Sequence, residues 1–267
     1  MCRIDGGGER CDGKPMTSFT QDLQTLGQIA VSAGRKIMEI YATDFASVAK
    51  ADASPVTAAD TAAEAIILEA LHRHFPETPV IAEEQAAAGK TETIGQSFFL
   101  VDPLDGTKEF ISKNGEFTVN IGLIEKGTPV MGVVYAPALG ELFLGRVGEG
   151  AFRTMAGVTG RIATRPCPKE GPVVLASRSH RDPETEAFIA AQKCSGVTNA
   201  GSSLKFCRLA EGQADLYPRF GRTMEWDTAA GHAVLAAAGG TVTHTDGTPF
   251  LYGKPGFANP AFIARGC

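Results

Sequence analysis

The stretch Phe98-Phe99-Leu100-Val101-Asp102-Pro103-Leu104-Asp105-Gly106-Thr107 joins an apolar run directly to two acids in a tight turn. The apolar run predicts a strand over 98–101, and Pro103 forces a turn after it. Asp102 and Asp105 are therefore expected at the carboxyl end of that strand, with their side chains directed toward the same point. Two carboxylates that close repel each other unless a proton or a cation lies between them. Mg²⁺ prefers oxygen ligands and is usually held by one or two carboxylates. The stretch therefore predicts a metal site.

The same turn also suits a phosphate group. The Leu104 carbonyl can point inward, and Gly106 lets the backbone approach a ligand closely. The amides of Gly106 and Thr107 are then available to phosphate oxygens. The alternative is an ordinary surface turn, in which the Asp side chains accept hydrogen bonds from the turn itself.

Two further acidic segments resemble the first in their setting. Ile81-Ala82 runs into Glu83-Glu84, and Trp226-Asp227 precedes an Ala-rich stretch that is expected to be a helix with Asp227 in its first turn. Taken singly, such acids are usually solvated or cap a helix. If Glu83, Asp102, Asp105 and Asp227 face one cleft, however, their combined charge requires two or more cations.

Hydrophobic periodicity indicates an α+β region before about Gly150. Apolar residues at three-and-four spacing predict a helix between Phe19 and Tyr41 and a second helix from Ala58 to His74, with Thr57 as its cap and Asp60 in its first turn. Short apolar runs separated by turn residues predict an antiparallel meander packed on these helices. The runs are Val80 to Ala82, Phe98 to Val101, Thr118 to Ile124, Val130 to Tyr135 and Leu142 to Leu144.

After Gly150 strands and helices alternate, which is typical of βαβ units. A strand is expected at 173–176, helices at 184–192 and 203–211, a strand at 216–217, and a helix from Asp227 to Gly239-Gly240. We therefore expect an antiparallel-sheet subdomain over 16–150, carrying the metal site, and an α/β subdomain over 151–267 that completes a pocket. Residues 1–15 are Gly-rich and patternless, which predicts a disordered leader.

Composition restricts the possible partners. The chain has 267 residues with 43% hydrophobic residues and a formal net charge of −5, so a broad cationic surface for a nucleic-acid polymer is not expected. No apolar run approaches the roughly 20 residues that cross a bilayer. Six cysteines without a C-x-x-C pair favour free thiols and a cytoplasmic location.

The residues around these acids resemble a known family. Asp102 to Thr107 (DPLDGT) resembles the first signature of the inositol monophosphatase superfamily, and Trp226 to Gly231 (WDTAAG) followed by Gly239-Gly240 resembles the second. The longer stretches Asp102 to Ile124 and Gly201 to Gly231 resemble the CysQ-type 3'(2'),5'-bisphosphate nucleotidases. Lys108-Glu109-Phe110 stands where the inositol branch typically has Thr-Asn-Phe.

The resemblance implies a layered α-β-α-β-α sandwich, with an antiparallel sheet followed by a mixed sheet, and a Mg²⁺-dependent phosphatase with two or three ions in its active site. It implies metal ligands at Glu83, Asp102, the Leu104 carbonyl, Asp105 and Asp227, and a water-orienting pair in Asp60 and Thr107. Glu83, Leu104, Asp105, Gly106, Thr107 and Asp227 would also border the substrate. The Gly201-Ser202-Ser203 turn would contact the sugar, and Lys205 would meet a second phosphate. Glu225 would bear on substrate choice.

The expected substrate is a small bisphosphorylated nucleotide such as 3'-phosphoadenosine 5'-phosphate. Inositol 1-phosphate or fructose 1,6-bisphosphate is the alternative within the family, and a regulatory protein that binds metal and phosphate without turnover is the alternative of another class. The basic and aromatic residues between Lys205 and Arg222 fit a small pocket for an anionic, adenine-bearing ligand, although such aromatics are more often core. Resemblance also implies inhibition by Li⁺, a monomer or homodimer, and in some relatives a peripheral association with the inner membrane surface.

Overall fold

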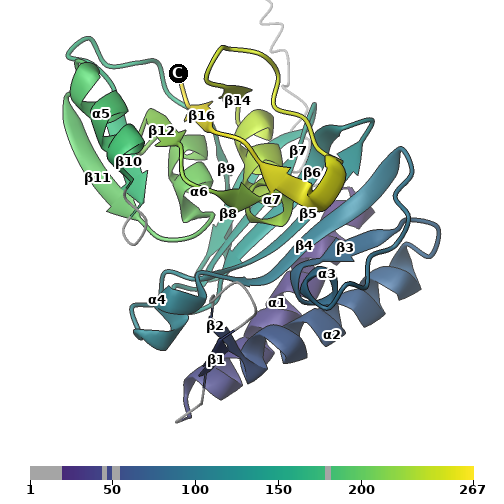
Figure 1. Ribbon diagram of the computed structural model, residues 1–267. Helices are drawn as coiled ribbons and strands as arrows, with labels where there is room; N and C mark the ends of the chain where they lie inside the picture. The colour runs from purple at the N-terminus through teal and green to yellow at the C-terminus, as the bar shows by residue number, and fades with distance from the viewer. Residues whose placement is uncertain (1–19, 44–46, 50–54, 178–181) are drawn as a thin grey trace, which may run out of the picture.

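The computed structural model describes residues 20–43, 47–49, 55–177 and 182–267. The expected leader, 1–15, lies outside these residues. The described chain forms alternating layers of helix and sheet (Figure 1). The layers are, in order, α1 and α2, a seven-stranded sheet, α6 and α7, a five-stranded sheet, and α5. The predicted α-β-α-β-α sandwich is confirmed.

The seven-stranded sheet has the order β3-β4-β5-β6-β7-β8-β9. Its strands are β3 (Val80–Ala82), β4 (Ser97–Asp105), β5 (Thr118–Glu125), β6 (Thr128–Ala136), β7 (Glu141–Arg146), β8 (Gly150–Met155) and β9 (Val158–Ile162). All neighbours are antiparallel except β3 and β4, which run parallel. The hairpin β8-β9 was not predicted, and it carries this sheet past Gly150. The change of sheet falls between Ile162 and Val173, while the division into 16–150 and 151–267 stays a prediction.

Two helices cover one face of this sheet. They are α1 (Gln21–Tyr41) and α2 (Ala58–His74), both close to their predicted bounds. The expected cap of α2 is present, because Thr57 Oγ1 accepts a hydrogen bond from the N–H of Ala59 at 3.1 Å. A small two-stranded sheet, β1 (Ser47–Ala49) with β2 (Pro55–Thr57), precedes α2. Buried side chains of α1, α2 and the sheet form one hydrophobic core.

The opposite face of the sheet is built to receive a helix at close range. Gly122, Gly132 and Gly145 lie opposite one another on β5, β6 and β7. A Cβ atom at Gly132 would lie 2.3 Å from the carbonyl oxygen of Ala230, and one at Gly145 would lie 2.6 Å from the Cα of Val234. The row of glycines therefore lets α7 (Glu225–Ala237) pack directly on the strand backbones, which fixes the position of its first turn.

The five-stranded sheet has the order β11-β10-β12-β16-β14 and is mixed, as predicted. Its strands are β10 (Val173–Ser177), β11 (Gly196–Ala200), β12 (Leu216–Arg219), β14 (Thr241–His244) and β16 (Phe262–Arg265). Helices α5 (Pro183–Ala191) and α6 (Leu204–Ala210) pack on its two sides. The remaining short elements are α3 (Glu83–Ala87), α4 (Thr107–Ile111), β13 (Thr223–Met224), η1 (Pro255–Phe257) and β15 (Ala258–Asn259).

Two expectations are corrected by the structure. Helix α7 begins at Glu225, so Asp227 is its third residue and accepts a 2.8 Å hydrogen bond from the N–H of Met224. Not every described cysteine is a free thiol, because Cys167 and Cys267 form a disulfide across 100 residues of sequence, whereas Cys194 and Cys207 are free. Within the described residues, no helix combines the length and the apolar character needed to cross a membrane.

Candidate active site

Three of the predicted metal ligands converge. Glu83 is the first residue of α3, Asp102 lies on β4 and Asp227 lies in the first turn of α7. One carboxylate oxygen from each residue lies within 4.8 Å of the other two. The convergence follows from topology, because β3 and β4 run parallel and bring their carboxyl ends to one edge, while the glycine row brings α7 onto the same edge.

The turn after Asp102 supplies the other predicted ligands. Asp105 lines the same cavity, but it is not part of the three-carboxylate cluster. Its Oδ2 accepts a hydrogen bond from Asn120 Nδ2 at 3.3 Å. The Leu104 carbonyl accepts from Thr107 Oγ1 at 3.3 Å, and the Leu104 N–H donates to Asp102 Oδ1 at 3.0 Å. The hydrogen bond to Asp102 is the side-chain-to-backbone bond expected of an ordinary Asp turn. The same motif therefore forms a turn and contributes a carboxylate to the acidic cluster.

The electrostatics of the cluster favour a cation. Burial raises the pKa of Asp227 well above its ordinary value, and the charges of Asp105 and Glu83 raise it further. Burial likewise raises the pKa of Asp105, although Lys205 opposes that shift. Carboxylates in this situation are stabilised by a divalent cation, and their hard oxygen donors fit Mg²⁺.

A second pair lies beside the cluster. Asp60 is 2% exposed, and its Oδ2 accepts hydrogen bonds from Thr57 N at 2.8 Å and from Thr57 Oγ1 at 2.7 Å. Its other oxygen, Oδ1, accepts from Thr107 Oγ1 at 3.3 Å. The first contact fixes the carboxylate at the start of α2, and the second directs Oδ1 toward Thr107, which lines the cavity.

Gly106 and the Gly201-Ser202-Ser203 turn fit against each other. Gly106 has a φ of +90°, and a Cβ there would lie 2.2 Å from Ser202 Oγ, so only glycine allows this approach. Ser202 Oγ donates to the Asp105 carbonyl at 2.8 Å, and Ser203 Oγ donates to the Asp227 carbonyl at 2.7 Å. The turn therefore ties together the backbones of two acidic segments. Among the described residues Ser202 lines the cavity, whereas Gly201 and Ser203 do not.

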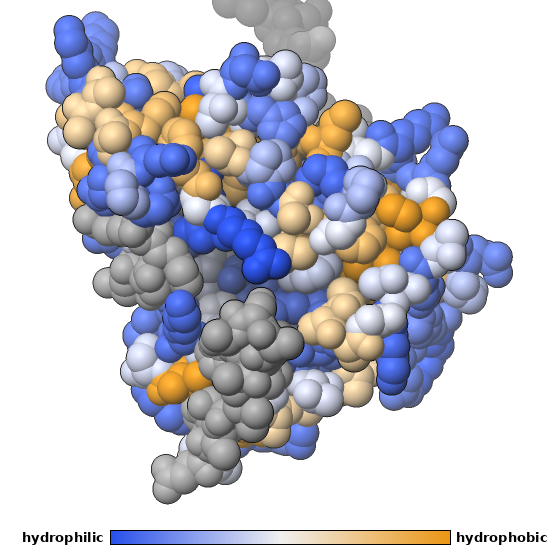
Figure 2. All heavy atoms as spheres, in the orientation of Figure 1, coloured by the Kyte–Doolittle hydropathy of each residue, from blue (hydrophilic) through white to orange (hydrophobic). Residues whose placement is uncertain are grey.

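A cavity of about 360 Å³ lies beside these residues, and Glu83, Asp105, Thr107 and Asp227 line it. Figure 2 shows hydrophilic side chains gathered around a hollow in the middle of this face. Cationic side chains of its lining are Lys108, Lys205, Arg219 and Arg222. Its other lining residues include Ser177, Glu109, Phe206, Tyr217, Thr223 and Thr228. One cavity thus has a cluster of acids together with several cations.

Lys205 is buried and held in place. Its Nζ donates to the Ser202 carbonyl at 2.7 Å and lies 5.3 Å from the centre of the Tyr217 ring. Burial lowers the pKa of Lys205 to about 8, against the opposing charge of Asp105. Lys205 is therefore a cation near neutral pH that loses its charge under mildly alkaline conditions.

Sequence reasoning assigned part of this lining and missed the rest. Of the basic and aromatic residues between Lys205 and Arg222, the cavity takes Arg219, Arg222, Phe206 and Tyr217. Arg208 points elsewhere and pairs with Glu141 and Glu211. Tyr217 and Arg219 are two residues apart on β12, so strand alternation was the signal that could have placed these two side chains on one face. Ser177, Thr223 and Thr228 carried no signal in the sequence.

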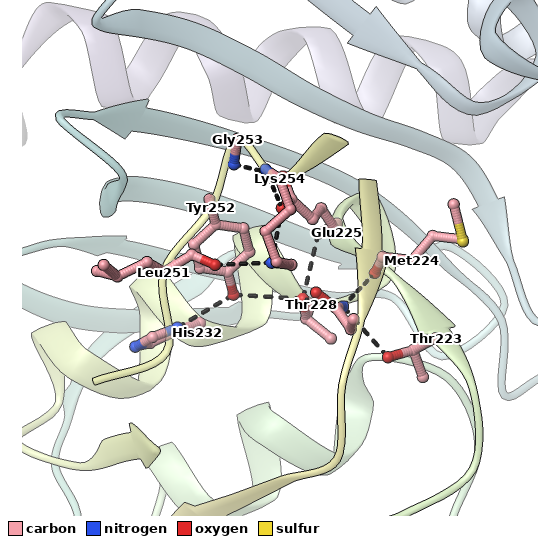
Figure 3. A network of polar contacts seen from close by, with 10 residues as sticks. Thr223, Met224, Glu225, Thr228, His232, Leu251, Tyr252, Gly253 and Lys254 are labelled. Atoms are coloured by element: carbon pink, nitrogen blue, oxygen red, sulfur yellow. Dashed lines mark hydrogen bonds and ion pairs between the residues drawn. The ribbon is translucent and has the colours of Figure 1, made fainter. Parts of the chain in front are cut away.

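Glu225 is held inside the fold near the start of α7. Its side chain is fully buried, and its two oxygens accept hydrogen bonds from the N–H groups of Gly253 and Lys254 at 2.8 and 2.9 Å (Figure 3). Among the described residues it is not part of the cavity lining. That Glu225 bears on substrate choice stays a prediction, and no direct contact with the cavity supports it.

Comparison with known proteins agrees with this architecture. The model of the "Inositol monophosphatase family" matches residues 20–265. The chain belongs to the inositol monophosphatase family. Within it, the chain is 47% identical to the 3'(2'),5'-bisphosphate nucleotidase CysQ of Escherichia coli K12 over 243 residues, which are 90% of this chain and 98% of that protein. It is 42% identical to the CysQ of Buchnera aphidicola, with 91% and 92% of the two chains covered.

Solved structures of the family share the fold. The crystal structure of CysQ from Bacteroides thetaiotaomicron superposes with a TM-score of 0.77 at 39% identity, covering 92% of this chain and 97% of that one. The inositol monophosphatase from Anabaena gives a TM-score of 0.74 at 29% identity, covering 94% and 92%. The resemblance to CysQ-type proteins that the sequence motifs suggested is confirmed.

Proposed function

We propose that this chain is a Mg²⁺-dependent phosphatase that removes the 3'-phosphate of 3'-phosphoadenosine 5'-phosphate, releasing AMP and phosphate. The observation that carries the proposal is the convergence of Glu83, Asp102 and Asp227 at a cavity that is also lined by Thr107, the hydrogen-bond partner of Asp60. The similarity to relatives named 3'(2'),5'-bisphosphate nucleotidase supports this choice of substrate.

The acidic residues would hold the metal. We assign Glu83, Asp102, Asp105, Asp227 and the Leu104 carbonyl as ligands of two or three Mg²⁺ ions. Bound divalent cations lower the pKa of water and stabilise negative charge on phosphate and leaving oxygens. All of these protein donors are oxygens, as Mg²⁺ prefers.

Asp60 would act as the base. The Thr107 hydroxyl orients a water molecule, and Asp60 Oδ1, 3.3 Å from that hydroxyl, accepts a proton from the water. The water oxygen bonds to phosphorus, the bond between phosphorus and the 3'-oxygen breaks, and the 3'-oxygen takes a proton from solvent. The N–H groups of Gly106 and Thr107 would hold the phosphate oxygens during this step.

The cations of the cavity favour a substrate with a second phosphate. Lys205, Arg219 and Arg222 line the same cavity as the acids, and a bisphosphorylated nucleotide offers a second dianion to them. We assign Ser202 and the neighbouring Gly201 and Ser203 to the sugar side of this site. Because the cations are confined to a cavity, the partner is a small nucleotide and not a nucleic-acid polymer. We place the enzyme in the cytoplasm as a monomer or a homodimer, and association with a membrane surface stays a prediction.

The test is a comparison of substrates. Purified protein in Mg²⁺ is given 3'-phosphoadenosine 5'-phosphate, inositol 1-phosphate or fructose 1,6-bisphosphate, and initial rates of phosphate release are read with malachite green. We expect kcat/KM for the nucleotide to exceed the others at least tenfold, corresponding to about 1.4 kcal/mol of preferred transition-state binding. A preference for either of the other substrates would overturn the assignment, and binding without turnover would favour a regulatory protein.

A further inference from the structure

Helix α3 begins with the proposed ligand Glu83, and its first turn is hydrogen-bonded to the side chain of Glu64, which belongs to another helix. Glu64 lies on α2, one turn after Asp60, and is buried. Its Oε2 accepts a 2.8 Å hydrogen bond from the N–H of Glu84, and its Oε1 accepts a 3.1 Å hydrogen bond from the N–H of Gln85. The first N–H groups of a helix have no partner within that helix, so this carboxylate fixes the start of α3.

The start of α7, which carries the proposed ligand Asp227, is held in a similar way by Glu225. Glu225 also accepts two hydrogen bonds from consecutive backbone N–H groups, those of Gly253 and Lys254, and Lys254 Nζ lies 2.6 Å from its Oε1. Figure 3 shows this contact between the first turn of α7 and the chain after β14. The carboxylate joins the two segments two residues before Asp227.

The same segment has a second attachment one turn along α7. Tyr252 Oη donates to Thr228 Oγ1 at 3.3 Å (Figure 3). Asn259 Nδ2 donates to the same oxygen at 3.1 Å. Thr228 follows Asp227 directly and lines the cavity. The residues on both sides of Asp227 are thus connected to the C-terminal part of the chain.

The hydrogen bonds of Glu64 and Glu225 act at two helix starts that would otherwise be displaced. When both carboxylates are ionised, as metal binding requires, the like charges on Glu83 and Asp227 push α3 and α7 apart, since the carboxylate oxygens lie within 4.8 Å. Helix α3 has five residues, too few to be stable by itself. Glu64 and Glu225 accept hydrogen bonds from backbone N–H groups, and among the described residues neither side chain is part of the cavity lining.

We propose that Glu64 and Glu225 are positioning residues, which hold the backbone beside Glu83 and Asp227 so that the acidic cluster is formed before a cation arrives. The inference rests on the proposed function, since it takes the cluster as a metal site. Residues that orient metal ligands typically contribute 10- to 100-fold in metal affinity.

The first test replaces Glu64 by Gln. The Glu64→Gln side chain keeps one acceptor oxygen but turns an NH₂ group toward a backbone N–H, so one of the two hydrogen bonds is lost. Mn²⁺, which has an electron paramagnetic resonance signal, is titrated into metal-free protein without substrate. We expect the dissociation constant for Mn²⁺ to rise about tenfold. Glu69→Gln is the matched control on the same helix, where the exposed Glu69 pairs with Arg73, and its affinity should equal that of the parent.

The second test applies the same measurement to the Glu225 contact. Glu225→Gln should weaken Mn²⁺ binding about tenfold. Lys254→Met removes the ion pair but leaves both backbone hydrogen bonds, so it should change the dissociation constant less than threefold, about 0.6 kcal/mol. If one Gln variant does not fold, as judged by circular dichroism, the other tests the inference.

Three outcomes decide the inference. Gln variants with a lower melting temperature but an unchanged Mn²⁺ affinity would show a purely structural role and would overturn it. If the variants give that result while the parent protein binds Mn²⁺ and hydrolyses the nucleotide, the proposed function is unaffected. Parent protein that binds no Mn²⁺ would overturn the proposed function and this inference together.

Discussion

Replacing Asp60 by Asn separates its two roles. Asp60 Oδ2 accepts two hydrogen bonds from Thr57 at the start of α2, while Oδ1 accepts one from Thr107. In Asp60→Asn the amide oxygen can take the place of Oδ2 and keep both contacts with Thr57. The NH₂ group then stands where Oδ1 was and can donate but cannot accept a proton. The substitution therefore removes the base and leaves the cap.

The magnitudes follow from these contacts. Loss of a general base lowers kcat by about 10²- to 10⁴-fold, roughly 3–5 kcal/mol in activation free energy. Because the cap is kept, stability should fall only through the lost charge at the helix start, about 0.3–1 kcal/mol. That loss corresponds to a few degrees in melting temperature.

The assay is phosphate release from 3'-phosphoadenosine 5'-phosphate in saturating Mg²⁺, together with a thermal melt. Asp22→Asn is the control, because Asp22 is an exposed acid in the first turn of α1 and lies outside the cavity lining. Its kcat should match that of the parent. A rate for Asp60→Asn within threefold of the parent, in folded protein that binds substrate, would refute the assignment of Asp60 as the base.

Four further outcomes are expected. KM for the nucleotide should rise as the pH exceeds about 8, because burial lowers the pKa of Lys205 to about 8 and its cation is lost above that pH; initial rates across pH measure this. Tyr217→Phe should raise KM roughly tenfold, because burial raises the pKa of Tyr217 and keeps its hydroxyl protonated as a hydrogen-bond donor at the cavity. The hydroxyl makes no hydrogen bond to the described residues, so the melting temperature of the variant should change little. Burial and neighbouring carboxylates raise the pKa of Asp227, so its ionisation destabilises the metal-free fold as pH rises, and Mg²⁺ should increase the melting temperature more at neutral than at acid pH. Reduction of the Cys167–Cys267 disulfide should lower stability by about 3 kcal/mol, measured by denaturant unfolding with and without reductant.

Elements with local signals were predicted well. The bounds of α2, Ala58–His74, agree with the sequence prediction because Thr57 at its start and the apolar spacing along it are visible within a few residues. Strands were predicted too short, since β4, β6 and β7 extend through polar or turn-like residues that still pair with a neighbour. Pairing depends on the adjacent strand, which a single segment does not reveal.

Features that depend on distant contacts escaped prediction. Strand β9 is the edge of its sheet and has no buried residue, and β8 shows no strict alternation of buried and exposed residues, so burial gives this hairpin no clear period-two pattern. The partners of Cys167 and Glu225 lie 100 and about 28 residues away in sequence. The sequence does not distinguish a glutamate that accepts hydrogen bonds inside the fold from one that is exposed to solvent. The roles of Glu64 and Glu225 therefore could not be predicted from the sequence.

Local folding rules and chemistry use the same carboxylates in this protein. Asp60 and Asp227 are each the third residue of a helix, and each accepts a hydrogen bond through Oδ2 from the residue before that helix. The constraint that starts the helix also fixes the plane of the carboxylate, so Oδ1 is directed without any support from the substrate. Asp102 follows the same principle through the N–H of Leu104. An acidic cluster built from capping and turn residues is therefore already oriented in the folded chain, which lowers the entropy cost of binding a cation and a phosphate.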